Sequence, residues 1–260
     1  MLGLAIYVDN NETYYSIFNC IGEVKEQGKN PGVIQQGVQQ LADIVETIIE
    51  RYPKLRSIAI GVPGVVNNGK IILIPTHLHF LNYDLKGEFE TRFQVPVVVE
   101  NDMNASVFGF ASNFEIENDT LVYLNFGKIG PGSGIMINGE VVRGRTFFSG
   151  EIAFVPQYGN HSFQQSIQLE GRNLRMVLAG DHQINAVSRL IATFVAILNP
   201  RAVIFCDDEI DEALLTRIAD KSSAYIPQEH LPKLMISNWR QDYLAGLQQL
   251  ALKLMITDCI

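Results

Sequence analysis

Cysteine is scarce in this sequence of 260 residues, which contains only Cys20, Cys206 and Cys259. Their odd number and wide spacing exclude a disulfide framework and a Cys-x-x-Cys metal site. Scattered thiols of this kind are typical of proteins in a reducing compartment, so we expect a cytoplasmic location and no bound metal.

Basic runs are also absent. The densest positive charges are two spaced pairs, Arg143 with Arg145 and Arg172 with Arg175, and the formal net charge is −8. Because nucleic-acid binding needs a basic surface, this chain alone is not expected to bind DNA or RNA, which leaves open a basic module in a longer protein. Neither a signal-peptide pattern nor an apolar run of membrane-spanning length occurs, so we expect no membrane association.

Charged residues are few as well, at 18%, whereas hydrophobic residues reach 47%. This composition predicts a large buried core and excludes extensive disorder. The length allows one large domain or two of ordinary size.

The most informative stretch begins with the apolar run at residues 95–99, which is typical of a strand buried on both faces of a parallel sheet. Asn101 and Asp102 follow at its carboxyl end, and residues 105–111 have helical character. Ligands of open α/β sheets gather at the carboxyl ends of strands, where a carboxylate can take a proton from a substrate hydroxyl. The alternative, equally weighted on this segment alone, is that Asn101 or Asp102 only caps the next helix.

The rest of the chain divides into two halves, each a strand meander followed by alternating helices and strands. This order predicts a doubled α/β architecture with a cleft between the halves. Strands are expected at residues 1–8, 13–18, from 24, 57–61, 70–74, 95–99, 120–126, 135–137, 202–205 and 234–236, and helices at 31–52, 84–93, 105–111, 163–178, 185–198, 212–219 and 242–254.

Two other motifs carry weak signals. The glycine-rich turn at residues 127–134 could cradle a phosphate, but it lacks the Gly-Lys-[Ser/Thr] of a P-loop. His77 and His79 could begin a zinc site, but no neighbouring residue supplies the other ligands, so an ordinary loop pair is the better interpretation.

Four segments together resemble the ROK family, which is named for repressors, open reading frames and kinases. They are Gly-Val-Pro-Gly at residues 61–64, Val-Glu-Asn-Asp-Met-Asn-Ala at 99–105, Asn-Gly-Glu-Val-Val-Arg-Gly at 138–144 and Ser-Gly-Glu-Ile at 149–152. The resemblance implies a two-domain actin-like ATPase (ribonuclease H-like) fold. On that basis we expect a smaller domain at residues 1–112, completed by the helix at 242–260, and a larger domain at 113–241 that carries dimerisation helices.

The resemblance also implies site residues. Gly64, Asn101, Asp102 and Glu151 stand at positions that contact a hexose in the family, and Glu170 is similar to a further sugar-contacting glutamate. Asp102 matches the base that deprotonates the attacking sugar hydroxyl.

Several family elements are missing. The first phosphate loop, Asp-x-Gly-Gly-Thr in the family, is replaced by Ala-Ile-Tyr-Val-Asp at residues 5–9, and the second lacks its threonine. Cys-Asp-Asp at 206–208 replaces an adenosine-side Gly-Gly-Gly, and two carboxylates there would repel a nucleotide. Phe154 occupies the position of the zinc-site histidine, and residues 155–171 contain no cysteine.

These departures favour a non-catalytic regulatory domain of a ROK-type regulator, in which Asp102 is a vestigial base and no cofactor is needed. Its partners would be a sugar or other small effector, a second copy through residues 163–198, a protein partner, and DNA only through a winged helix–turn–helix module absent from this sequence. The alternatives are a divergent ATP-dependent sugar kinase with Asp102 as base, and an interaction module that binds neither sugar nor nucleotide.

Overall fold

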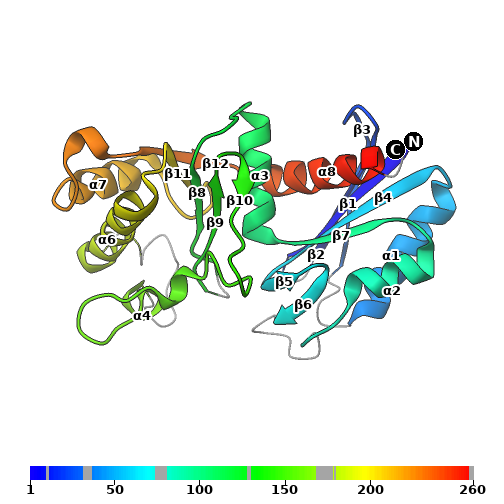
Figure 1. Cartoon of the computed structure of the whole chain (residues 1–260), viewed down its shortest axis with the longest axis horizontal. Helices are drawn as coiled ribbons and strands as arrows, with labels where there is room; N and C mark the ends of the chain where they lie inside the picture. Colours follow the sequence, from blue (N-terminus) through cyan, green and yellow to red (C-terminus); the bar gives the residue numbers. More distant parts are fainter. Residues whose placement is uncertain are drawn as a thin grey trace. The chain divides into compact units, whose positions relative to one another are not determined.

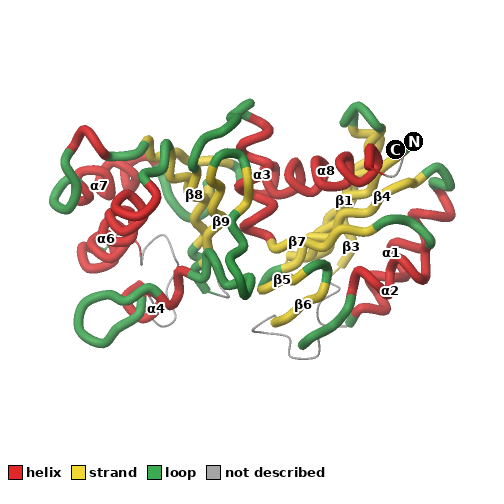
Figure 2. The backbone as a smooth tube through the Cα atoms, viewed as in Figure 1, coloured by secondary structure: helices red, strands yellow, loops and turns green. Residues whose placement is uncertain are grey.

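The structure is a computed structural model that describes residues 1–9, 12–31, 37–73, 81–127, 130–167, 178 and 180–257 (Figure 1). It divides into two compact units, Met1–Asn113 with Tyr243–Ile260 and Phe114–Asp242. Each unit contains one five-stranded mixed sheet and its own helices (Figure 2). Among the described residues, no helix is both long and apolar enough to cross a membrane.

The sheet of the first unit has the strand order β3-β2-β1-β4-β7. The first three strands form the antiparallel meander predicted from the sequence, and β1, β4 and β7 are parallel. Leucine, isoleucine and valine at alternating positions of these strands, such as Ile58, Ile60 and Val62, make one buried cluster with residues of the helices α1 (Val38–Arg51) and α2 (Leu85–Phe93). The strands are β1 (Leu2–Asp9), β2 (Glu12–Asn19), β3 (Val24–Pro31), β4 (Leu55–Val62) and β7 (Val97–Asn101).

The predicted helix start at Pro31 is wrong. Strand β3 runs through Pro31, which pairs with Glu12 at the end of an edge strand, and helix α1 begins at Val38. An edge position tolerates proline because the missing N–H is not needed for pairing there. The remaining elements of this unit are the hairpin of β5 (Val65–Asn67) and β6 (Lys70–Leu73), and the helices α1 (Val38–Arg51), α2 (Leu85–Phe93) and α3 (Asp102–Asn113).

Helix α8 (Trp239–Thr257) begins in the second unit and runs into the first, where it packs closely on α3. A Cβ atom at Gly246 would lie 1.9 Å from the carbonyl oxygen of Ala105. Glycine is therefore required for this approach of the two helix backbones.

The sheet of the second unit has the order β10-β9-β8-β11-β12. The predicted Asn-Gly hairpin is confirmed, since Asn138 and Gly139 have φ values of 51° and 79°, as a two-residue turn of this type requires. Strands β8, β11 and β12 are parallel, so their carboxyl ends meet at one edge. The strands are β8 (Leu121–Asn125), β9 (Gly132–Ile137), β10 (Glu140–Val141), β11 (Ala202–Cys206) and β12 (Lys233–Ser237).

Helices α4 (Phe163–Ile167), α6 (Asp181–Leu198) and α7 (Glu212–Ser222) complete the second unit. One face of α6 is buried in the core of this unit, whereas Ile197 near its end is 73% exposed. Leu178, expected at a dimer interface, is 0% exposed within the same core, so that choice of contact residue is wrong. Residues 168–177, which are also part of the predicted interface, lie outside the described residues.

Candidate functional site

The first candidate region is the carboxyl end of β7, where the strand passes directly into α3. The strand is buried because valine fills its faces, and α3 starts at Asp102 itself. This places the side chains of Asn101 and Asp102 where a parallel sheet offers its ligand site.

Asn101 uses its whole side-chain amide within the protein. Its Oδ1 accepts hydrogen bonds from the backbone N–H groups of Met103 at 2.9 Å and Asn104 at 3.0 Å, so it caps α3. Its Nδ2 donates to the Gly64 carbonyl oxygen and to Asp102 Oδ1, each at 2.9 Å. Since an asparagine amide makes at most four such bonds, a ligand that contacts Asn101 has to replace one of them.

Asp102 is partly buried and firmly oriented. Its Oδ1 accepts the Asn101 amide and the backbone N–H of Met103, both at 2.9 Å. The positive end of the α3 dipole stabilises the carboxylate at this position. A carboxylate held in place in this way can accept a proton from a hydroxyl, which is the chemistry predicted for Asp102.

Three of the five predicted ligand residues therefore come together, because Gly64, with φ of 101°, belongs to the turn that Asn101 holds against α3. Glu151 belongs to the second unit, and Glu170 lies outside the described residues. Sugar contact by any of these residues stays a prediction.

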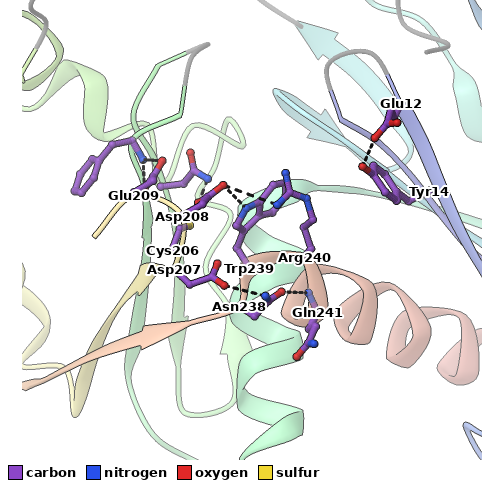
Figure 3. Close-up of polar contacts among 12 residues, drawn as sticks. Glu12, Tyr14, Cys206, Asp207, Asp208, Glu209, Asn238, Trp239, Arg240 and Gln241 are labelled. Carbon is purple, nitrogen blue, oxygen red and sulfur yellow. Dashed lines mark hydrogen bonds and ion pairs between the residues drawn. The ribbon is translucent and has the colours of Figure 1, made fainter. Parts of the chain in front are cut away.

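Aromatic rings also pack around Tyr7 of β1, at the position where the family's first phosphate loop would start. Tyr7 pairs with Tyr14 on one side and Gly61 on the other, and its ring stacks on Tyr14 with centroids 5.0 Å apart. The ring of Tyr243, from α8, lies 4.6 Å from that of Tyr7 and rests over Gly61. The Tyr14 hydroxyl in turn donates to the Glu12 carboxylate (Figure 3). Sequence reasoning missed Tyr243, because this residue is distant from Tyr7 in the chain.

The second candidate region is the carboxyl edge of β8, β11 and β12 in the other unit. Figure 3 shows the acidic turn after β11 bonded to the start of α8. Asn238 donates to Asp207 at 2.8 Å, and the Trp239 indole N–H donates to Asp208 at 3.1 Å. The Arg240 guanidinium lies 3.9 Å from Asp208. Asp207 and Asp208, the acidic residues that stand where the family has glycines, are therefore part of a hydrogen-bonded turn.

Glu209 was missed by sequence reasoning and is only 5% exposed. Both of its carboxyl oxygens lie 2.9 Å from the backbone nitrogen of Phe126, which donates to them (Figure 3). The pKa of Glu209 is raised to about 8, chiefly by burial and also by the nearby Asp208 carboxylate, although the Phe126 N–H acts to lower it. No sequence pattern signals a contact across this distance in the chain.

The backbone N–H of Gly127, the residue after Phe126, also donates to a side chain of the protein. Asn125 Oδ1 accepts the N–H of Gly127 at 2.6 Å, while Asn125 Nδ2 donates to the sulfur of Cys206 at 3.4 Å. Burial raises the pKa of the Cys206 thiol, so this cysteine stays protonated and unreactive. The two backbone donors that open the glycine-rich turn are thus bonded to the protein's own side chains.

Glu151 occupies a loop that is fixed to β9. Gly150 has φ of 94°, and a Cβ there would lie 2.1 Å from the carbonyl oxygen of Ser133, whose N–H donates to the Gly150 carbonyl at 2.8 Å. Burial raises the pKa of the Glu151 carboxyl, and no described residue forms a hydrogen bond or ion pair with it. A partly desolvated carboxylate without a partner is suited to accept hydrogen bonds from a ligand.

No group of three or more metal-ligating side chains occurs in the parts of the chain that the structure describes. His77 and His79 lie outside those parts. The expectation of no bound metal stays a prediction.

The sequence profile of the ROK family matches residues 7–162. The chain belongs to the ROK family. The xylose repressor of Caldicellulosiruptor bescii is 30% identical over 166 residues, which cover 58% of this chain and 41% of that protein. The chain spans less than half the length of the curated repressors it matches.

Solved structures confirm the α/β actin-like ATPase fold that the resemblance implied. The ROK hexokinase from Thermus thermophilus superposes with a TM-score of 0.79 at 18% identity, covering 99% of this chain and all of that one. A ROK family transcriptional regulator, a homologue of the E. coli MLC protein, gives a TM-score of 0.75 at 18% identity and covers 98% of this chain and 80% of that one. At this identity the likeness concerns the fold alone, and ROK kinases and ROK regulators share it.

Proposed function

We propose that this chain is a non-catalytic, sugar-responsive regulatory domain of a ROK-type regulator, with no capacity to transfer phosphoryl groups from ATP. One observation carries the proposal. The backbone amides of Phe126 and Gly127, which open the glycine-rich turn, already donate to Glu209 and Asn125 of the same unit.

A phosphate-binding turn needs free, convergent N–H groups, because these donors neutralise the phosphate charge. Here a carboxyl group lies on the first of them. An incoming phosphate would have to displace Glu209 and also meet the carboxylates of Asp207 and Asp208 in the same turn.

The first unit supports the same conclusion independently. In the family the first phosphate loop depends on paired glycines, whereas here Tyr7 is 2% exposed and packed between Tyr14 and Tyr243. Displacing a buried tyrosine costs several kcal/mol, on the order of the 3–5 measured for removing large aromatic side chains from cores. Two phosphate elements are therefore blocked by different means.

The curated relatives support a regulatory function with a sugar effector, since several are xylose repressors. We accordingly assign the effector to the sugar class, place DNA binding in a separate winged helix–turn–helix module of a longer protein, and expect a cytoplasmic homodimer. Glu151, whose carboxylate has no hydrogen-bond or ion-pair partner among the described residues, is the group of the second unit that would contact the sugar. The fixed Asp102 carboxylate is the corresponding candidate in the first unit.

The alternative is a divergent sugar kinase that uses Asp102 as its base. Its main support is the corner itself, since the Asp102 carboxylate is fixed and placed at the ligand end of a parallel strand. A third candidate, an interaction module that binds neither sugar nor nucleotide, is favoured by Phe154 in place of the family's histidine.

Thermal-shift titration of the whole chain separates the three candidates. A ligand at 100 times its Kd stabilises the folded state by about 2.7 kcal/mol, which raises Tm visibly. We expect a shift with at least one of D-xylose, D-glucose, fructose and N-acetylglucosamine, and none with ATP–Mg²⁺. An absent sugar shift would favour the interaction module.

A coupled kinase assay with the same four sugars provides the second test, and we expect no turnover. Turnover that Asp102→Asn abolishes would establish the kinase alternative. Asp84→Asn is the matched control, because Asp84 also places a carboxylate at a helix start in the same unit, where it accepts the Gly87 N–H at 3.0 Å.

A further inference from the structure

Two exposed aromatic side chains flank Glu151 in the second unit. Phe148 is 49% exposed and Phe154 is 65% exposed, although phenylalanine is among the residues most often buried. Their ring centroids lie 5.2 Å apart with an interplanar angle of 47°, so the two rings form one continuous apolar surface. We call Phe148 and Phe154 the aromatic pair.

Backbone hydrogen bonds tie both members of the aromatic pair to Glu151. The N–H of Glu151 donates to the Phe148 carbonyl at 3.4 Å, and the N–H of Phe154 donates to the Glu151 carbonyl at 3.3 Å. Two successive turns therefore centre on Glu151. The contact of Gly150 with β9 holds the first of these turns against the sheet.

The loop also contains an unfavourable backbone conformation. Phe147 has φ of 60°, which is uncommon for a bulky residue and costs of the order of 1–3 kcal/mol. Exposed rings, a carboxylate without a partner among the described residues and a strained backbone thus coincide within eight residues, 147–154. Core packing does not explain the two rings, because both are largely exposed.

We infer that the aromatic pair is a stacking surface for the apolar face of a sugar whose hydroxyl groups donate to Glu151. A pyranose presents C–H groups on its faces and hydroxyl groups around its rim. A flat apolar ring beside a carboxylate acceptor complements that arrangement. This assignment rests on the proposed sugar-responsive function. Phe148 and Phe154 would then determine which face of the sugar ring packs against the protein.

The test measures sugar binding by the whole chain with isothermal titration calorimetry and saturation-transfer NMR, using D-xylose, D-glucose, fructose and N-acetylglucosamine. We expect saturation to pass from aromatic protons to sugar C–H protons. Phe154→Ala should weaken binding about tenfold, the size of a good aromatic contact, whereas Phe154→Trp should preserve it. Phe154→Leu keeps apolar volume but loses the flat ring, so it should resemble the alanine variant.

Ile197→Ala is the control, since it removes an apolar side chain of α6 that is also exposed, and it should leave sugar affinity unchanged. Because Phe148 and Phe154 are exposed, their variants should fold normally, which far-UV circular dichroism verifies. Sugar binding that depends on Glu151→Gln but not on either phenylalanine would overturn the inference and leave the proposed function intact.

Two other outcomes also decide the question. If the wild-type chain binds none of the four sugars, the inference and the sugar-responsive function both fail. If Phe148→Ala and Phe154→Ala bind sugar normally but reduce the mass measured by light scattering, the aromatic pair is a protein interface and the inference is wrong.

Discussion

Replacing Glu209 by glutamine should raise the free energy of unfolding relative to the wild type, and this difference should grow as the pH rises. Glutamine keeps an oxygen that can accept the Phe126 N–H but cannot ionise. Alanine is a poorer choice, since it would leave that buried N–H without a partner, at a cost of about 1–3 kcal/mol. Glu209→Gln therefore isolates the charge from the hydrogen bond.

The expected size follows from the pKa of Glu209, which is about 8 in the folded chain and 4.5 as an ordinary glutamate. An acid with a raised folded pKa contributes stability fully below its unfolded pKa, and that contribution is lost as the pH rises to the folded value. At about 1.36 kcal/mol per pH unit, the wild type should lose up to about 5 kcal/mol between pH 4.5 and 8 from this group. Local relaxation reduces that figure, so we expect about 3–5 kcal/mol.

The measurement is urea unfolding at several values between pH 4.5 and 8, followed by the fluorescence of Trp239. This residue is the single tryptophan of the sequence and donates to Asp208, so it reports on the unit that contains Glu209. The quantity of interest is the difference in free energy of unfolding between Glu209→Gln and wild type, and in particular its change with pH. Glu140→Gln, at an exposed position of β10, is the control and should show no such trend.

A constant difference across this pH range would refute the reasoning. It would mean that Glu209 is ionised in the folded chain over the whole range, with water or a cation reaching it. A difference that narrows with rising pH would show that ionised Glu209 stabilises the unit.

Three further predictions concern other regions. Gly150→Ala should destabilise the chain by about 3 kcal/mol more than Gly139→Ala, because both positions have positive φ but only Gly150 would place its Cβ 2.1 Å from Ser133 O; equal losses in urea unfolding would contradict this. Elemental analysis should find no stoichiometric zinc, and one zinc per chain would overturn that expectation. Light scattering should give about twice the single-chain mass of 29.0 kDa, and Ile197→Asp should lower it; a monomeric wild type would defeat the dimer, and an unaffected dimer would exclude that surface.

Sequence reasoning located most of the strands, though not β5 or β10, and the corner at Asp102, because local patterns determine them. Runs of valine and isoleucine mark strands that are buried on both faces, and the Asn-Gly pair marks a turn with two positive φ values. The corner was visible because the polar residues begin where the apolar run of β7 ends.

The contacts of Glu209 with Phe126 and of Tyr243 with Tyr7 could not be predicted in the same way. Glu209 meets Phe126 only because β8 and β11 are adjacent and parallel, and residues 83 positions apart then meet at one edge. Tyr243 reaches Tyr7 only because α8 lies over Gly61. Such pairings depend on the order of strands in the sheet and on the position of the helix. The hydrophobic periodicity of a single segment does not predict either of these.

The family motif around Asp102 is weak evidence for kinase activity, because its residues also have a structural role. Asn101 caps α3, holds the Gly64 turn and orients Asp102, and Glu100 accepts the Asn101 N–H at 2.9 Å and the Asn104 amide at 3.1 Å. These bonds satisfy donors at the start of a helix, which would otherwise be unpaired whether or not a substrate is present. A chain without phosphoryl transfer would therefore still need this corner to fold, whereas it would have no need of free amides at Phe126 and Gly127. The corner is kept and those amides are bonded internally, which is the combination that the regulatory function predicts and the kinase alternative does not.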